Sequence, residues 1–181
     1  MSAEIPLLQV EELKTWFGSR SRPVRAVDGV SFHVPAETTV ALVGESGCGK
    51  TVTALSLARL VSETAGFYAG GRVLFEGRDV LRMSRRELGA LRGGGIAYIF
   101  QEPGIALNPV QRIGRQVSEA VRLHDPASAP RKRAIELLDT VGLPVPDRLY
   151  RRYPYELSGG MQQRVMIAMA LACRPRLLVA D

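Results

Sequence analysis

Apolar and polar positions in the N-terminal part of the chain predict three strands and a helix. Residues 7–17 and 24–34 alternate as strands do, and the polar, arginine-rich stretch 18–23 between them predicts a hairpin loop. The run TTVALVG at 38–44 is short and apolar and leads into a glycine-rich loop, so it predicts a strand buried on both faces. Residues 51–61 repeat apolar positions with helical period. The expected order is therefore strand, glycine-rich loop, helix.

The rest of the chain predicts alternating strands and helices around one purely helical stretch. Further strands are expected at 71–76, 96–101 and 177–181, and helices at 84–92, 112–124, 130–141 and 158–173. Residues 104–156 contain helical patterns broken by Pro and Gly, and no strand pattern. This organisation predicts an α/β core that carries a helical insertion.

Composition narrows the class of protein. The chain has 181 residues, of which 46% are hydrophobic and 23% charged, with 18 Gly and 11 Pro. These ordinary globular values exclude disorder, collagen and a small disulfide-stapled protein. No run of about 18 uncharged apolar residues occurs, so an integral membrane protein is also excluded. The N-terminal residues MSAEIPLLQVEELK have no basic n-region, and we expect no signal peptide.

Charge and cysteine usage add little to this picture. The formal net charge is +6, but the arginines are scattered in small clusters, which favours solvated faces and subunit contacts over a polyanion site. No nucleic-acid partner is therefore expected. Cys48 and Cys173 lack metal-ligand spacing and fit a reducing compartment.

A phosphate-binding loop is the most specific chemical signal in the sequence. Residues 44–51 fit G-x-x-x-x-G-K-[ST] and lie between the predicted strand and helix, the context that this motif requires. Its members are Gly44, Glu45, Ser46, Gly47, Cys48, Gly49, Lys50 and Thr51. The glycines let backbone N–H groups point at phosphate oxygens, and the following helix adds its N-terminal dipole. Lys50 supplies a positive charge, and the Thr51 hydroxyl is a hard oxygen ligand for Mg²⁺.

Two polar residues follow predicted core strands. Asp181 ends the apolar run LLVAD, at the edge where open α/β sheets bind ligands, and beside a phosphate loop it predicts a Mg²⁺ ligand near Thr51. Gln101 follows IAYIF, where the core gives way to the helical insertion. Its amide could contact Mg²⁺ or water and a moving subdomain, or could lie on the surface without a role.

Two further candidates involve a helix start and an aromatic side chain. Ser158 is a good N-cap for the helix at 158–173, and Gly159 and Gly160 expose its backbone to an approaching phosphate. Two glycines in a first turn are costly for a helix that is only structural, which favours a functional need. Phe17 ends the first strand and could stack on a purine ring, although aromatics at strand ends more often belong to the core.

Together these residues resemble the nucleotide-binding subunit of an ABC transporter. GESGCGKT at 44–51 looks like the Walker A loop, Gln101 the Q-loop, LSGGMQQR at 157–164 the signature and LLVAD at 177–181 the Walker B strand. Their order and separations match over essentially the whole chain. The stretches IFQEPGIALNP and YPYELSGGMQQRVMIAMALACRPRLLVAD are similar to the ATP-binding subunits of dipeptide, oligopeptide and nickel importers.

This resemblance implies a fold and its subdivision. The expected fold is a P-loop NTPase core with a mostly parallel sheet, an N-terminal antiparallel β subdomain and an inserted α-helical subdomain. Its expected parts are an antiparallel β region at 1–37, a P-loop core at 38–103, a helical subdomain with the signature helix at 104–173, and the Walker B strand at 174–181.

The resemblance also implies a mechanism and partners. Two subunits would close head to tail over two ATP molecules with Mg²⁺, each ATP lying between 44–51 of one subunit and 158–160 of the other. Phe17 would stack on adenine, and Gln101 would link the γ-phosphate and metal to the helical subdomain. The surface at 102–109 would face a permease on the cytoplasmic side of the membrane. An extracytoplasmic solute-binding protein would take part indirectly.

The C-terminus departs from the family pattern, and other functions stay open. The family places a catalytic Glu directly after the Walker B Asp, so the chain resembles a fragment that ends just before it, and we expect no repeated turnover from this chain alone. The leading interpretation is an ATP-hydrolysing motor of an importer for peptides or similar solutes. The alternatives are a soluble ABC ATPase that acts on DNA or ribosomes, and a nucleotide-binding fragment without turnover.

Overall fold

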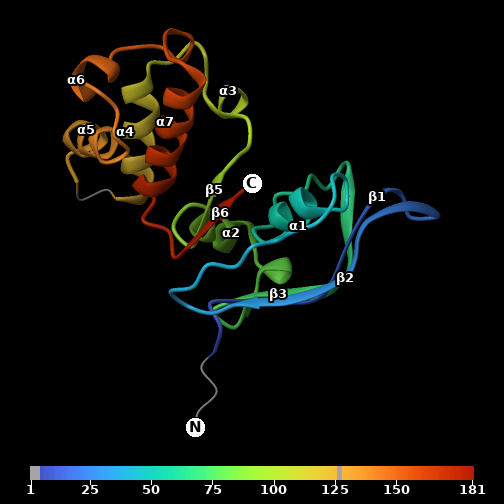
Figure 1. Cartoon of the computed structure of the whole chain (residues 1–181). Coiled ribbons are helices and arrows are strands. Elements are labelled where there is room, and N and C mark those ends of the chain that lie inside the picture. The colour runs from blue at the N-terminus through green and yellow to red at the C-terminus, as the bar shows by residue number, and fades with distance from the viewer. Residues whose placement is uncertain (1–4, 126–127) are drawn as a thin grey trace. The chain divides into compact units, whose positions relative to one another are not determined.

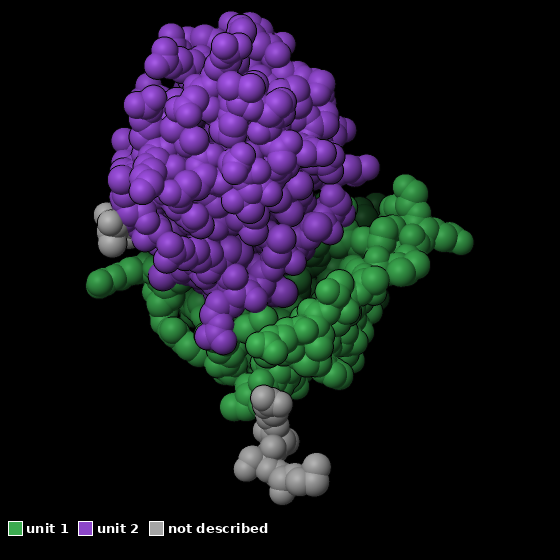
Figure 2. Space-filling view, turned by 60° about the vertical axis from the view of Figure 1, so that its left-hand side comes forward, with its two compact units in different colours: residues 1–89 green, residues 90–181 purple. Residues whose placement is uncertain are grey.

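The computed structural model describes residues 5–125 and 128–181 (Figure 1). The chain forms two compact units, residues 1–89 and 90–181, which Figure 2 distinguishes by colour. No helix in the described ranges is both long enough and apolar enough to cross a membrane.

Unit 1 is built on an antiparallel sheet with strand order β2-β1-β3-β4. Its strands are β1 (Leu8–Ser19), β2 (Arg22–Val34), β3 (Gly66–Phe75) and β4 (Arg78–Asp79). The β1–β2 connection is tighter than the predicted loop, because Ser19 pairs with Arg22. The sheet also extends beyond the N-terminal region, since β3 pairs along β1 and begins earlier in the chain than its apolar pattern predicted.

A β-bulge changes which positions of β1 are buried. Leu8 and Val10 are buried before it, and Leu13 and Thr15 after it, so the buried positions shift from even to odd numbers. The register shifts between Val10 and Leu13, where Glu12 has a φ of 45°. A bulge inserts one extra residue, which restores the apolar face to the core.

The helix of unit 1 is shorter than its apolar period predicted. Helix α1 runs over Lys50–Ser56 and packs on β1 and β2. Its last residue is fixed to the sheet, because the hydroxyls of Ser56 and Thr15 lie 3.0 Å apart in a buried hydrogen bond. Arg59, with a φ of 53°, prevents the helix from continuing, although Val61 beyond it is still buried.

The predicted buried strand at 38–44 is wrong for this structure. No residue of this segment is in a strand, and Val40, Leu42 and Val43 are 45%, 43% and 90% exposed. A strand is defined by ladder hydrogen bonds to a neighbour, and no described residue supplies such a ladder here. The apolar pattern identified a segment suited to a strand, but it does not show whether a neighbouring strand is present to pair with it.

Unit 2 combines a parallel strand pair with a helical bundle. Strands β5 (Ile96–Ile99) and β6 (Leu177–Ala180) pair in parallel, Ile96 opposite Leu177. The helices after the unit boundary are α3 (Pro103–Ala106), α4 (Ile113–His124), α5 (Pro130–Thr140), α6 (Pro146–Leu149) and α7 (Gly159–Ala172). Helix α2 (Arg85–Leu91) spans that boundary.

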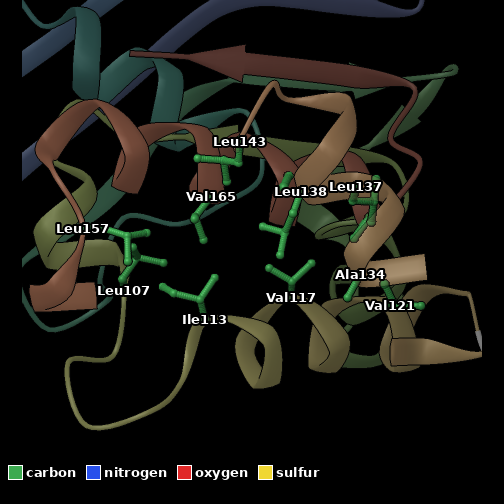
Figure 3. Packing of buried hydrophobic residues seen from close by; sticks show 12 residues of the cluster. Leu107, Ile113, Val117, Val121, Ala134, Leu137, Leu138, Leu143, Leu157 and Val165 are labelled. Atoms are coloured by element: carbon green, nitrogen blue, oxygen red, sulfur yellow. The ribbon is translucent and has the colours of Figure 1, made fainter. Parts of the chain in front are cut away.

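The helical bundle has a continuous apolar core, shown in Figure 3. Helices α4, α5 and α7 pack on one another, and their inward side chains include Ile113, Val117, Leu138 and Val165, each fully buried. Leu107, just after α3, joins the same cluster. Leu157, just before α7, also belongs to the cluster and lies beside Leu107, so the core anchors both the segment that follows α3 and the start of α7.

Short elements that begin at a proline do not show in the sequence pattern. Helix α3, helix α6 and the 3₁₀ turn η2 (Pro154–Glu156) each begin with Pro, whose fixed φ suits a first helical position. The turn η1 (Val80–Arg82) instead starts after Asp79, whose carboxylate accepts from the Leu81 N–H. One or two turns contain too few residues to show a hydrophobic period.

Candidate functional site

The glycine-rich loop at 44–49 has a backbone shape that favours glycine at its key positions. Gly47 and Gly49 have φ angles of 80° and 95°, which side chains rarely adopt. A Cβ on Gly49 would lie 2.3 Å from the Ala26 carbonyl oxygen of β2, and one on Gly44 would lie 2.6 Å from Cys48 Sγ. A Cβ on Gly47 would meet nothing within 4 Å. The loop therefore closes on the sheet at Gly49 and is open at Gly47.

Lys50 places its charge over this loop. Its Nζ donates to the carbonyl oxygens of Gly44 at 2.8 Å and Glu45 at 2.7 Å, and lies 3.8 Å from Cys48 Sγ. Lys50 forms no ion pair with any carboxylate of the described ranges. An ammonium held only by neutral acceptors keeps its full charge for an anion.

Thr51 and the exposed loop complete a cradle that fits a phosphate chain. Thr51 is exposed at the start of α1, and Glu45, Ser46 and Cys48 are exposed in the loop. The loop offers exposed backbone, a left-handed glycine turn, one ammonium and one hydroxyl. This donor set suits phosphate oxygens, and the hydroxyl also suits a hard divalent cation.

Gln101 and Asp181 lie at one edge of the parallel pair. The Asp181 N–H donates to the Ile99 carbonyl oxygen at 3.0 Å, and Gln101 follows Ile99 by two residues. Both side chains are exposed. Because the carboxyl ends of parallel strands share one edge, both residues follow the strands at the same edge of the pair.

The predicted signature residues form the exposed start of α7. Ser158 is the N-cap, and its hydroxyl accepts from the Met161 N–H at 3.4 Å. A Cβ on Gly159 or Gly160 would meet nothing within 4 Å, so the first turn is open on the side of these residues. Ser158 thus caps the N-terminus of α7, as the sequence predicted, and the backbone at the two glycines is left uncovered.

The segment before α7 is held by residues whose role the sequence reasoning missed. Glu156 accepts from the Tyr153 N–H at 2.7 Å and forms an ion pair with Arg152. The Tyr153 N–H, followed by Arg152, holds the pKa of Glu156 below its ordinary value. The Gln162 amide donates to the Pro154 and Leu157 carbonyl oxygens at 2.9 and 3.3 Å. The signal was present as a capping pattern, a Glu three residues after an N-cap.

Phe17 lies near the end of β1, opposite Val24 of β2 and Gly66 of β3. A Cβ on Gly66 would lie 3.0 Å from Phe17 Cδ1, so the ring packs on this glycine. Phe17 is half-buried. The ring therefore has both a core contact and an exposed part.

The predicted site residues fall into two groups by unit. Phe17 and the loop with Lys50 and Thr51 belong to unit 1, while Gln101, Asp181 and the signature belong to unit 2. Among the described residues, no three His, Cys, Asp or Glu side chains gather as a metal site would need. Asp181 is the one carboxylate among the predicted Mg²⁺ ligands, so these residues would bind the cation together with hydroxyl, amide or phosphate oxygens.

The fold and the loop together define the P-loop NTPase class, and solved structures agree. The dimeric ATP-binding cassette MJ0796 bound to ADP and Pi matches with a TM-score of 0.82 and 26% identity, covering 96% of this chain and 73% of that one. The cbiO1 structure from Clostridium perfringens, part of the ABC transporter complex cbiONQ, matches with a TM-score of 0.76 and 27% identity, covering 98% of this chain and 66% of that one. The expected α/β P-loop fold is confirmed.

The family model described as ABC transporter matches residues 27–181. The chain belongs to the ABC transporter family.

Similar curated proteins carry peptide-transport names. The probable peptide ABC transporter ATP-binding protein y4tR of Sinorhizobium fredii is 48% identical over 97% of this chain and 53% of its own length. The oligopeptide transport ATP-binding protein OppD of Bacillus subtilis is 44% identical over 97% of this chain and 49% of its own length. The dipeptide transport ATP-binding protein DppD of Escherichia coli is 46% identical over 97% of this chain and 54% of its own length. The chain spans about half the length of these relatives.

Proposed function

We propose that this chain is the ATP-binding and ATP-hydrolysing part of a motor subunit that drives import of peptides or a similar small solute. The observation that carries the proposal is Lys50, held over an exposed glycine loop in a member of the ABC transporter family. The peptide-transport names of relatives at 44–48% identity support the solute class. They favour a transport motor over a soluble ATPase that acts on DNA or ribosomes.

Nucleotide binding rests on the loop and on α1. The loop N–H groups at 44–49 would surround the phosphates of ATP, and the Lys50 ammonium would pair with the outer phosphate oxygens. Phe17 would stack its exposed part on the adenine. The half-buried ring packed on Gly66 supports a fixed stacking platform.

Hydrolysis requires ligands that hold Mg²⁺ and a group that orients water. Thr51, Gln101 and Asp181 would hold Mg²⁺, which supplies positive charge to the phosphate oxygens when it is bound. The Gln101 amide would also orient the attacking water. The shared edge of Gln101 and Asp181, fixed by the Asp181 N–H on Ile99, supports this division of roles.

A second subunit would complete the site through the signature. The open first turn of α7, with Ser158, Gly159 and Gly160, would contact the phosphates bound by a partner subunit. The bare space beside both glycines supports this contact. The MJ0796 cassette is dimeric in its structure with ADP and Pi, which supports such a dimer here.

The permease contact is proposed for residues 102–109, which include α3. Glu102, Asn108 and Pro109 are exposed, while Leu107 anchors the segment in the helical core. This anchoring would transmit force from the permease into the bundle. The subunit would lie peripherally at the cytoplasmic face of the membrane, with an extracytoplasmic binding protein delivering the solute.

Ser158→Arg separates nucleotide binding from dimer closure. The bulky cation should abolish ATP-dependent dimerisation and leave binding by the monomer unchanged, because Ser158 lies outside unit 1. Fluorescent-ATP titration and analytical ultracentrifugation measure the two properties. The matched control is Ser21→Arg, in an exposed turn, which should change neither. Weakened monomer binding in Ser158→Arg would contradict the proposed roles.

A further inference from the structure

A basic cavity lies in unit 2, and none of its lining residues belongs to the Q-loop, the signature or the Walker B strand. Its volume is about 390 Å³, within the roughly 300–1,000 Å³ of small-molecule sites. It is bounded by α4 and by the residues that follow α6. The lining residues are Arg112, Arg115, Ser118, Arg122, Tyr150 and Arg151.

Three of the four lining arginines carry positive charge without compensation, because only Arg112 acts on a carboxylate of the described residues, that of Glu156. No carboxylate lines the cavity, and Glu119, which lies between two of the arginines in α4, is not among the lining residues. In the described part of the chain, Arg115, Arg122 and Arg151 form no ion pair. Arg112 lies over the Tyr153 ring, 5.7 Å from its centroid. Guanidinium groups without acidic partners favour an anion.

One wall of the cavity is rigid. The Tyr150 ring packs directly on Gly114, where a Cβ would lie 2.2 Å from Tyr150 Cγ. The Tyr150 hydroxyl lies 3.0 Å from Ser118 Oγ, and the Gly114 N–H donates to the Tyr150 carbonyl oxygen at 2.9 Å. The Arg131 guanidinium lies 5.6 Å from the ring centroid. These contacts fix the ring, so the wall needs no ordering when a ligand binds.

We propose that this cavity binds a small anion that carries two or more phosphoryl groups. Arg115 and Arg122 are two turns apart in α4, a rise of about 10 Å. A chain of phosphoryl groups spans this spacing and can contact both guanidinium groups at once, whereas a single phosphate requires the two side chains to bend toward each other. The planar guanidinium matches a phosphate bidentately, which favours phosphoryl groups over a lone halide.

The site differs from the phosphate loop in place and in chemistry. The loop uses backbone N–H groups and one ammonium of unit 1, whereas this cavity uses guanidinium groups of unit 2. An anion bound here would contact α4, whose opposite face belongs to the apolar core of the bundle. The bound anion would thereby stabilise the helical bundle directly.

Calorimetric titration with inorganic pyrophosphate tests the proposal. The titration uses the Lys50→Ala protein, which lacks the ammonium of the phosphate loop. Pyrophosphate should bind this protein with one-to-one stoichiometry and more tightly than inorganic phosphate. Arg115→Gln with Arg122→Gln should weaken that binding at least about tenfold, because each change removes a charge-assisted contact.

The matched control removes the same charge elsewhere. Arg85→Gln with Arg86→Gln changes two exposed arginines of α2 and should leave pyrophosphate affinity unchanged. Circular dichroism checks that all variants fold. Equal weakening in both pairs, or no pyrophosphate binding to the Lys50→Ala protein, would overturn the proposal. Binding of oligoglutamate or of phosphatidylglycerol vesicles without pyrophosphate binding would also overturn it, in favour of an acidic protein or a membrane surface.

Discussion

Lys50 shows how one side chain can define a binding site. Its ammonium lies within hydrogen-bond distance of two loop carbonyl oxygens and has no carboxylate partner in the described ranges. Neutral acceptors orient the charge without cancelling it. A phosphate that approaches the loop therefore meets an oriented cation whose charge is not shared with a carboxylate.

Replacing Lys50 by alanine should weaken ATP binding strongly. The change removes charge-assisted hydrogen bonds of about 1.5–3 kcal/mol each, so the dissociation constant should rise at least about tenfold. Fluorescent-ATP titration measures it. Lys132→Ala, which removes an exposed lysine from α5, should leave the affinity as it is. Equal effects of both changes would argue against a specific role for Lys50.

The two cysteines should differ in their reaction with maleimide. Cys48 is exposed in the phosphate loop, whereas Cys173 is half-buried, and burial raises the pKa of the Cys173 thiol. The raised pKa keeps Cys173 protonated at neutral pH, so it should react slowly and faster as pH rises. MgATP should slow only the labelling of Cys48. Mass spectrometry of the labelled peptides resolves the two sites, and equal protection of both would contradict the assignment.

Among the helices, α4 depends on a glycine for reasons of space. The Tyr150 ring occupies the position where a Gly114 side chain would begin. Gly114→Ala should therefore lower the free energy of unfolding by about 1–3 kcal/mol through overpacking. Gly89→Ala in α2, where a Cβ would meet nothing within 4 Å, should instead raise it by about 0.5–1 kcal/mol. Urea denaturation compares the pair, and a stabilised Gly114→Ala would show that the ring can move aside.

The turn before α7 should weaken in acid. The pKa of Glu156 lies below its ordinary value of 4.5, first because of the Tyr153 N–H and then because of Arg152. A lowered folded pKa stabilises the protein above the unfolded value, and this stabilisation is lost as pH falls through the folded pKa. Glu156→Gln should thus destabilise the protein at pH 7, and its effect should shrink as the pH falls from 4.5 through the folded pKa. Glu119→Gln, an exposed change in α4, is the control for denaturation across the same pH range.

A helix long enough to show a hydrophobic period can be predicted from the sequence. A strand that depends on hydrogen bonds to a neighbouring strand cannot. The pattern predicts a helix over 112–124, and α4 spans Ile113–His124, because its turns display their apolar face in the sequence. The strand at 38–44 fails because its ladder depends on a neighbour. The site follows the same rule. The phosphate loop and the signature are contiguous motifs and can be recognised in the sequence. The hydrogen bonds by which Glu156 and Gln162 hold the segment before α7 could not be predicted from residue spacing.

For the molecule as a whole, the exposed segment 38–44 is a hazard for association. Its Val and Thr side chains have high β-propensity, and Val43 is 90% exposed. Unpaired apolar segments of this kind add to one another as strands. Surface charge elsewhere, +6 overall, opposes association only at a distance and is screened by salt.

Heating should therefore make the protein aggregate through this segment. Val43→Lys should delay the onset of light scattering, because a charge at this position disfavours strand pairing. Val110→Lys, at a valine that is 81% exposed in a loop of unit 2, should not delay it. Equal delay by both substitutions would show that net charge, not the segment, controls association.

The unequal surroundings of Gly47 and Gly49 determine which substitutions each position tolerates. Both positions have left-handed backbone, but the Ala26 carbonyl oxygen closes the space beside Gly49 alone. In a saturation library selected for folding, position 47 should admit Asn and Asp, the residues that best tolerate this conformation. Position 49 should admit no residue other than glycine. Position 47 of the loop can therefore change during evolution, whereas position 49 must remain glycine.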